Sequence, residues 1–159
     1  LDTGMRLGEC LQITDDDLDM DERTICLPAE HTKGRRTRFV FFSVKTSKNL
    51  QRWLRYKDRY TNSKLLFPVK SGTPMEVHSF ESSFKRYLER AGIDKKYSPH
   101  ALRNNFAKRC LMNGMDIYTL SRILGHSSVS VTENAYLDLT DKDLRRRYQN
   151  FSPIEHLHR

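Results

Sequence analysis

The sequence lacks the residue patterns that mark disulfide-bonded, metal-binding or membrane proteins. Its three cysteines, Cys10, Cys26 and Cys110, are odd in number, far apart and without a C-x-x-C pair. We therefore expect reduced, buried thiols of an intracellular protein and no disulfide framework. No apolar run approaches the length of a membrane span and no signal peptide is recognisable, which predicts a cytosolic protein without a membrane partner.

The potential metal ligands also lack the spacing that is typical of zinc and calcium sites. The six histidines form no H-x-x-x-H pair and have no cysteine partner, which argues against zinc. The acidic run at 15–22 lacks the D-x-D-x-D-G spacing and the distal glutamate of a calcium loop, so it predicts a polar turn. We expect no metal ion.

Charge is the strongest feature of the composition. The 159 residues fit one globular domain, with 37% hydrophobic and 30% charged residues. Residues 1–30 hold nine acids and two bases, whereas the rest holds 26 bases and 11 acids. Such a basic body favours a polyanionic partner, nucleic acid first, although charge alone also fits a merely solvated surface.

The periodicity predicts an α+β fold that is mostly α-helical, with a small antiparallel sheet of at most three strands. Residues 24–27 and 38–44 are rich in β-branched and aromatic types and predict two paired strands, with Lys33 at the tip between them. Ser47 is expected to cap a helix to about Tyr60, with the stem of Lys57 on its inner face. Further helices are expected around 80–91, 99–113, 117–124 and from Thr140, the first with an aromatic stripe in the core.

The stretch from Ser98 to Tyr136 carries the candidate chemistry. His100 and Arg103 are three residues apart and share a helix face. Leu124-Gly125-His126 follows, and Tyr136 lies ten residues beyond His126. This set suits the binding of a phosphodiester and its attack by a tyrosine.

These motifs resemble the catalytic core of the tyrosine recombinases, the phage-integrase family. Two earlier segments complete the likeness: Thr3–Glu9, similar to the box with the family's first arginine, at Arg6, and Thr32–Arg38, similar to the hairpin with its lysine, at Lys33. The resemblance implies that residues 1–159 are a catalytic domain, that the N-terminal DNA-clamping domain lies outside this chain, and that 140–159 form a C-terminal tail.

Physical chemistry supports two of the roles directly. Guanidinium is always charged and binds two phosphate oxygens in one plane, so Arg6 and Arg103 suit a phosphate clamp, each worth roughly 10²–10³ in rate. We expect their replacement by alanine to leave the fold nearly intact. A phenol with a pKa near 10 needs help from cations and a base, which Tyr136 would require as a nucleophile.

The resemblance implies the remaining roles. His100 would accept the phenol proton, His126 would bind the scissile phosphate and Lys33 would protonate the leaving 5′-oxygen. A 3′-phosphotyrosine link would store the bond energy, so no cofactor or metal would be needed. Arg35, Arg36 and Arg38 flank Lys33 and are expected to contact DNA.

The implied function is site-specific DNA recombination or integration, for a phage or other mobile element, in the cytoplasm of a bacterium. The expected partners are double-stranded DNA and other protomers on that DNA, with a monomer in free solution. Two alternatives stay open: a non-catalytic helix-turn-helix regulator, with Gly125 at its turn, and a type IB topoisomerase. Taken singly, His100 also fits a helix cap, His126 a turn residue and Tyr136 a packing residue like Tyr118 or Tyr148.

Overall fold

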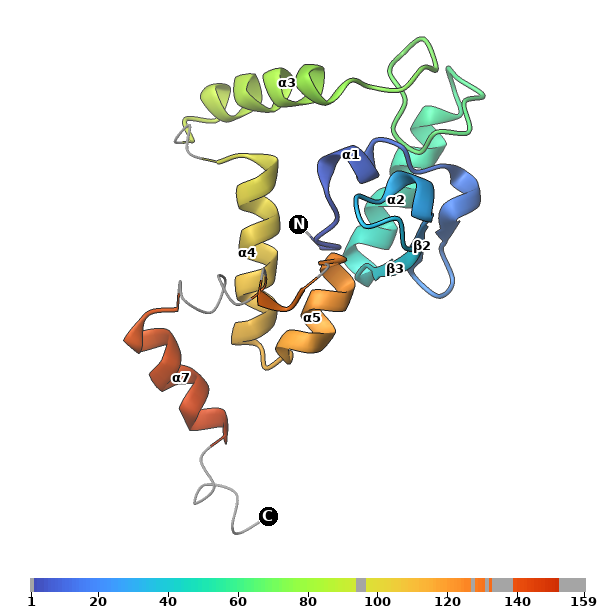
Figure 1. Cartoon of the computed structure of the whole chain (residues 1–159). Helices are drawn as coiled ribbons and strands as arrows, with labels where there is room; N and C mark the ends of the chain where they lie inside the picture. Colours follow the sequence, from blue (N-terminus) through green and yellow to red (C-terminus); the bar gives the residue numbers. More distant parts are fainter. Residues whose placement is uncertain (1, 94–96, 127, 131, 133–138, 152–159) are drawn as a thin grey trace.

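The computed structural model describes residues 2–93, 97–126, 128–130, 132 and 139–151 (Figure 1). Its fold is mostly helical with one three-stranded sheet, as the sequence predicted. The strands are β1 (Leu18–Asp19), β2 (Thr24–Leu27) and β3 (Arg38–Phe41). The helices are α1 (Leu7–Cys10), α2 (Val44–Lys57), α3 (Val77–Arg90), α4 (Pro99–Met112), α5 (Ile117–Leu124) and α7 (Asp141–Phe151), with the 3-10 turns η1 (Asp15–Asp17) and η2 (Ala29–His31).

The sheet and α2 enclose the first hydrophobic core. The strands are antiparallel in the order β1-β2-β3, and β2 pairs with β3 from Thr24 opposite Phe41 to Leu27 opposite Arg38. Alternate residues of each strand face inward, which suits a sheet with one covered face. The buried members of this core are Ile13, Ile25, Leu27, Val40, Phe42, Leu50 and Leu66.

The start of α2 differs from the prediction. Ser43, not Ser47, is the N-cap, and its hydroxyl accepts a 3.3 Å hydrogen bond from the Thr46 amide. The Asp2 carboxylate accepts bonds from Ser43 N at 2.7 Å and the Thr46 hydroxyl at 2.6 Å, so a distant residue helps to fix this end. β3 accordingly stops at Phe41, and Ser47 is buried inside the helix.

A second core lies between α4 and α5. It consists of Ala107, Leu111, Leu120 and Leu124, with Phe106, Cys110 and Met115 packed against it. The predicted start of α4 at Pro99 and the predicted limits of α5 are confirmed. Asp116 caps α5, and Gly125 ends it in the left-handed region at φ 65°. Because α5 contacts both α4 and β3, it joins the two cores, and the turn after it lies where they meet (Figure 1).

Two helices project from this body. The sequence predicted that the aromatic stripe of α3 lies in the core, and this prediction is wrong, because no residue of α3 is buried. Phe80 and Phe84 stack on each other instead, with ring centroids 6.0 Å apart. α7 leads away from α4 in Figure 1, and Leu144 and Tyr148 are exposed. The three cysteines are free thiols, half-buried rather than fully buried. None of the helices in the described part of the chain could span a bilayer.

Candidate active site

The first part of the site is the segment Gly4–Glu9. Gly4 has φ 64°, and a Cβ there would lie 2.4 Å from the ring of Phe106, so only glycine lets this segment lie so close to α4. Arg6 immediately precedes α1, and Glu9 sits in its first turn with 3% of its surface exposed. The Glu9 carboxylate accepts bonds from Arg6 N at 2.8 Å and Arg6 Nη1 at 3.1 Å. A buried carboxylate therefore braces the partly exposed Arg6 guanidinium.

Arg103 is the buried centre of the site. It projects from α4, is 8% exposed, and donates from Nη1 to Gly4 O at 2.6 Å and from Nη2 to Leu124 O at 2.8 Å. Burial, with repulsion from Arg6, lowers the pKa of Arg103 to about 10. The guanidinium thus keeps its charge at neutral pH while it ties the N-terminal segment to the end of α5.

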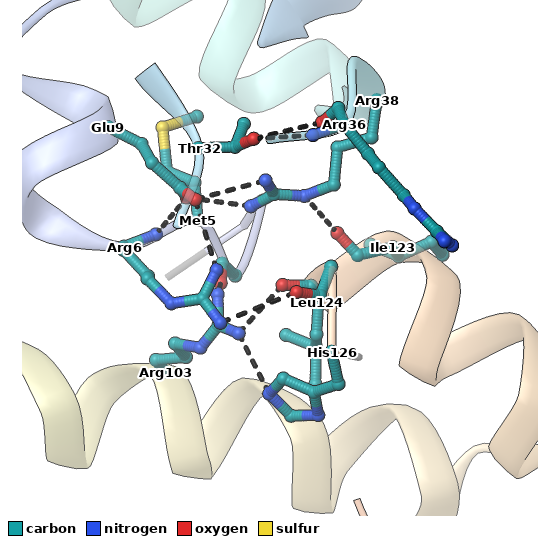
Figure 2. A network of polar contacts seen from close by, with 12 residues as sticks. Met5, Arg6, Glu9, Thr32, Arg36, Arg38, Arg103, Ile123, Leu124 and His126 are labelled. Carbon is teal, nitrogen blue, oxygen red and sulfur yellow. Dashed lines mark hydrogen bonds and ion pairs between the residues drawn. The ribbon is translucent and has the colours of Figure 1, made fainter. Parts of the chain in front are cut away.

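His126 follows Gly125 and contacts Arg103 (Figure 2). Its Nε2 lies 2.9 Å from Arg103 Nη2, and its Nδ1 lies 2.8 Å from the hydroxyl of buried Thr132. A guanidinium only donates, so Nε2 must accept and the ring proton is on Nδ1, donated to Thr132. Burial, followed by repulsion from Arg103 and Arg6, lowers the pKa of His126 to about 4. The imidazole is therefore neutral at physiological pH.

The structure brings Arg6, Arg103 and His126 together from three distant segments. Arg6 Nη2 donates to Gly125 O at 3.4 Å, next to the Leu124 carbonyl that Arg103 binds. With Arg38 nearby, the guanidiniums outnumber the single Glu9 carboxylate, so the cluster has an excess of positive charge (Figure 2). Such a cluster favours an anionic group held by several directed N–H donors.

Arg38 differs from its predicted place among the DNA contacts. Its side chain is 10% exposed and donates from Nη1 and Nη2 to Glu9 at 3.0 and 2.6 Å, and from Nε to Ile123 O at 3.0 Å. Burial alone would raise the pKa of the Glu9 carboxyl, but the hydrogen bonds from Arg38 and Arg6 outweigh it and lower that pKa. Arg35 and Arg36, by contrast, are exposed as a DNA contact requires.

The other predicted residues are placed differently. Lys33 is exposed in the loop between β2 and β3, and His100 is exposed in the first turn of α4, one turn before Arg103. Tyr136 lies outside the described residues. Among the residues that the structure does describe, no group of three potential ligands could hold a metal ion.

Two contributors were not recognised from the sequence. The Gly4 carbonyl binds Arg103, and the Thr132 hydroxyl binds His126. Gly4 stands within the motif of Arg6, so its position was a usable signal. Thr132 offered none, because a threonine six residues after a histidine has no characteristic spacing.

Comparison with known proteins gives consistent results. The model of the phage integrase family matches residues 1–143. Tyrosine recombinase XerD of Corynebacterium glutamicum is 31% identical over 154 residues, and XerC of Lactobacillus leichmannii is 28% identical over 156. Each alignment covers 95% of this chain but only 49% and 52% of the relative, so the chain spans about half their length. The crystal structure of XerA recombinase superposes with a TM-score of 0.83 at 33% identity, over 96% of this chain and 55% of that one.

Proposed function

This chain belongs to the phage integrase family, and we propose from that premise that it is the catalytic domain of a site-specific DNA recombinase. The observation that carries the proposal is the Arg6–Arg103–His126 cluster, which the fold assembles from three segments around the carbonyls of Leu124 and Gly125. Residues 1–159 would form the DNA-cutting domain, and residues 140–159 its C-terminal tail.

Arg6 and Arg103 suit a clamp on the scissile phosphate. Among the described residues, Arg103 uses three of its five N–H donors, which leaves Nε–H and one Nη1–H for a ligand. A phosphate bound side-on to Nε and Nη2 would replace the His126 contact. The bonds to Gly4 O and Leu124 O would remain, so the guanidinium is held in place before the substrate arrives.

His126 would change its hydrogen-bonding role when the phosphate binds. In the free protein its Nε2 accepts from Arg103, whereas contact with a phosphate oxygen requires Nε2 to donate. The Thr132 hydroxyl can accept from Nδ1–H or donate to bare Nδ1, so it supports either tautomer. The negative charge of the phosphate would also raise the pKa of His126 from its low value and favour the doubly protonated ring.

The reaction would proceed through a covalent link to Tyr136. Its phenol oxygen forms a bond to phosphorus while the bond from phosphorus to the 5′-oxygen breaks. The phenol proton passes to His100, and the ammonium of Lys33 gives a proton to the departing oxygen. Acid–base help of this kind is worth roughly 10²–10⁴ in rate. Attack by a 5′-hydroxyl on the phosphotyrosine reverses the steps and reseals the strand, without a nucleotide cofactor or metal.

The basic surface and the relatives support DNA as the partner. Arg35 and Arg36 would contact the phosphate backbone beside Lys33. From a function on DNA we infer a protein of the bacterial cytoplasm that acts for a phage or other mobile element.

The exposed tail suggests how protomers associate. Thr140 and Asp143 form a capping box at the start of α7, and Asp143 lies 3.2 Å from Lys108 of α4. Leu144 and Tyr148 are 48% and 64% exposed, which leaves an apolar strip available to a neighbouring protomer on DNA. We infer a monomer in free solution and assembly on DNA with two sites. Deletion from Thr140 onward in the full-length protein should spare single-site binding and remove cooperative assembly; unchanged assembly would refute this role of the tail.

The experiment that tests the proposal begins with the target site. Recombinant junctions are recovered and sequenced from cells that express the full-length protein. A nicked substrate built on that site should then trap a covalent protein–DNA adduct with the wild type and none with Tyr136→Phe, which should still bind DNA. An adduct that survives in Tyr136→Phe but is lost in Tyr118→Phe or Tyr148→Phe would assign the nucleophile elsewhere.

The same assays separate the alternatives. A helix-turn-helix regulator would bind the site and form no adduct. A type IB topoisomerase would form an adduct and relax supercoiled DNA without strand exchange between two sites. A recombinase should yield exchanged junctions.

A further inference from the structure

Arg38 lies at the base of the loop that carries Lys33. It is opposite Leu27 in the last paired position of β2 and β3, and the loop of residues 28–37 joins the two. The loop has an internal support in Thr32, which is 6% exposed. The Thr32 hydroxyl lies 3.1 Å from Ala29 O and 3.0 Å from Arg36 O, which share its one proton, and it accepts from Arg36 N at 3.1 Å. The Lys33 side chain thus projects from a loop that the Thr32 hydrogen bonds hold in one shape.

The same arginine connects this loop to the phosphate clamp. Its fork binds Glu9, which also holds Arg6, and its Nε binds the Ile123 carbonyl, three residues before His126 (Figure 2). Among the described residues, the hydrogen bonds from residues 28–41 to α1 and α5 all come from Arg38. The clamp has further bonds of its own, because Arg6 keeps two contacts to Glu9 and Arg103 holds Leu124 O.

We propose that Arg38 is a positioning residue that sets the Lys33 loop at its working distance from the phosphate clamp. The inference rests on the proposed function, since it concerns the proton that Lys33 gives to the leaving oxygen. It assigns Arg38 to the placement of the general acid and not to contact with DNA.

The geometry requires a guanidinium at this position. Two parallel bonds to a carboxylate and a third bond to a carbonyl need a planar fork with donors on two sides, which lysine does not have. The turn at Gly125 is shaped around this fork, because a Cβ on Gly125 would lie 2.7 Å from Arg38 Nε. Arg38→Lys keeps the positive charge but loses the planar fork. It should therefore disturb the position of the Lys33 loop relative to the phosphate clamp without changing the charge of the site.

The leaving group reveals whether the general acid is misplaced. With an ordinary substrate the 5′-oxygen needs a proton, so displacement of Lys33 by about 1 Å should slow cleavage on the order of 10²-fold. With a 5′-bridging sulfur in place of that oxygen, the bond from phosphorus to sulfur breaks and a thiolate leaves without a proton. A defect confined to the acid therefore disappears on the sulfur substrate, whereas a defect in the clamp persists.

The experiment measures single-turnover cleavage by the full-length protein, at saturating DNA, on matched oxygen and sulfur substrates. Arg38→Lys should lose about 10²-fold on oxygen and return to within about threefold of wild type on sulfur, like Lys33→Ala. Arg6→Ala should stay slow on both substrates. The control Arg23→Gln changes an exposed arginine in the turn between β1 and β2, where its carbonyl accepts from Phe42 N, and should cleave both substrates at the wild-type rate.

Thermal melts and non-covalent DNA binding verify that each variant is folded; if Arg38→Lys is not, Thr32→Val takes its place, because it loosens the same loop without touching the ion pair. Wild-type cleavage of oxygen DNA by Arg38→Lys, or an equal loss on both substrates by the folded variant, overturns the inference. Failure of the wild-type protein to form any adduct would instead refute the proposed function.

Discussion

Replacement of Arg103 by methionine should damage both cleavage and stability, whereas the same change at Arg6 should damage cleavage alone. From sequence, both arginines were expected to serve only the ligand. In the structure Arg103 is 8% exposed and bonded to two backbone carbonyls, while the Arg6 side chain is 31% exposed and reaches Gly125 O only at 3.4 Å. The two variants therefore separate support of the fold from binding of the phosphate.

The expected loss of unfolding free energy in Arg103→Met follows from the hydrogen bonds that the substitution removes. Without Arg103, the carbonyls of Gly4 and Leu124 face an apolar side chain, at a cost of about 1–3 kcal/mol each. Removal of a buried charge offsets part of this, so we expect the free energy of unfolding to fall by about 2–4 kcal/mol. For a domain of this size, that lowers Tm by about 5–15 °C. Arg6→Met should cost no more than about 1 kcal/mol, because its ion pair is partly solvated and Glu9 keeps Arg38.

The assay compares thermal melts and adduct formation for the two variants in the full-length protein. Both should lose roughly 10²–10³ or more in cleavage rate at a temperature where both are folded. If Arg103→Met melts together with the wild type, its bonds to Gly4 and Leu124 do not hold the site together. Equal destabilisation by Arg6→Met would equally refute the distinction.

Three further predictions concern the surroundings of the clamp. Arg35→Gln and Arg36→Gln should each reduce the slope of log affinity against log salt by about 1, measured by DNA titration at several salt concentrations. Thr132→Val should slow cleavage by about 10-fold and Thr132→Ser should cleave at the wild-type rate, because only a hydroxyl can hydrogen-bond both tautomers of His126. Equal cleavage rates for Thr132→Val and the wild type would refute this role of Thr132. Since the pKa of His126 is about 4 in the folded state and near 6.5 when unfolded, the unfolded chain binds the extra proton between these values. The unfolding free energy should therefore fall by about 1 kcal/mol as the pH drops from 6.5 to 4, since the ring is partly solvated. If the unfolding free energy of His126→Gln falls by the same amount, His126 is not the cause.

Local signals explain which parts of the fold could be predicted. β2, the limits of α5 and the start of the helix at Thr140 were predicted because each depends on residues within one turn or one pleat. The buried stem of Lys57 followed from helical periodicity, although its ion pair with Asp15 at 2.6 Å did not. The resemblance to the recombinase motifs likewise implied that Arg6, Arg103 and His126 would meet.

Long-range contacts explain what could not be predicted. Ser43 caps α2 with help from Asp2, and no local rule ranks it above Ser47. Arg38 follows Arg35 and Arg36 in a basic run, and its inward direction depends on Glu9 and Ile123, which are 29 and 85 residues away. A charged residue in such a run is usually solvated, so only the tertiary structure could reveal this exception.

Arg103 connects the parts of the site, so the effects of substitutions there are coupled. Arg103 binds the backbone on both sides of the cluster, so a residue that would bind the substrate also holds the segments that present Arg6 and His126. Glu9 and Arg38 extend the same arrangement to the Lys33 loop. Residues connected in this way act as a unit, and effects of single substitutions on cleavage should not add. Double-mutant cycles across the Arg103–His126 contact, measured with DNA bound and free, would show how much of each loss belongs to chemistry and how much to the placement of its neighbours.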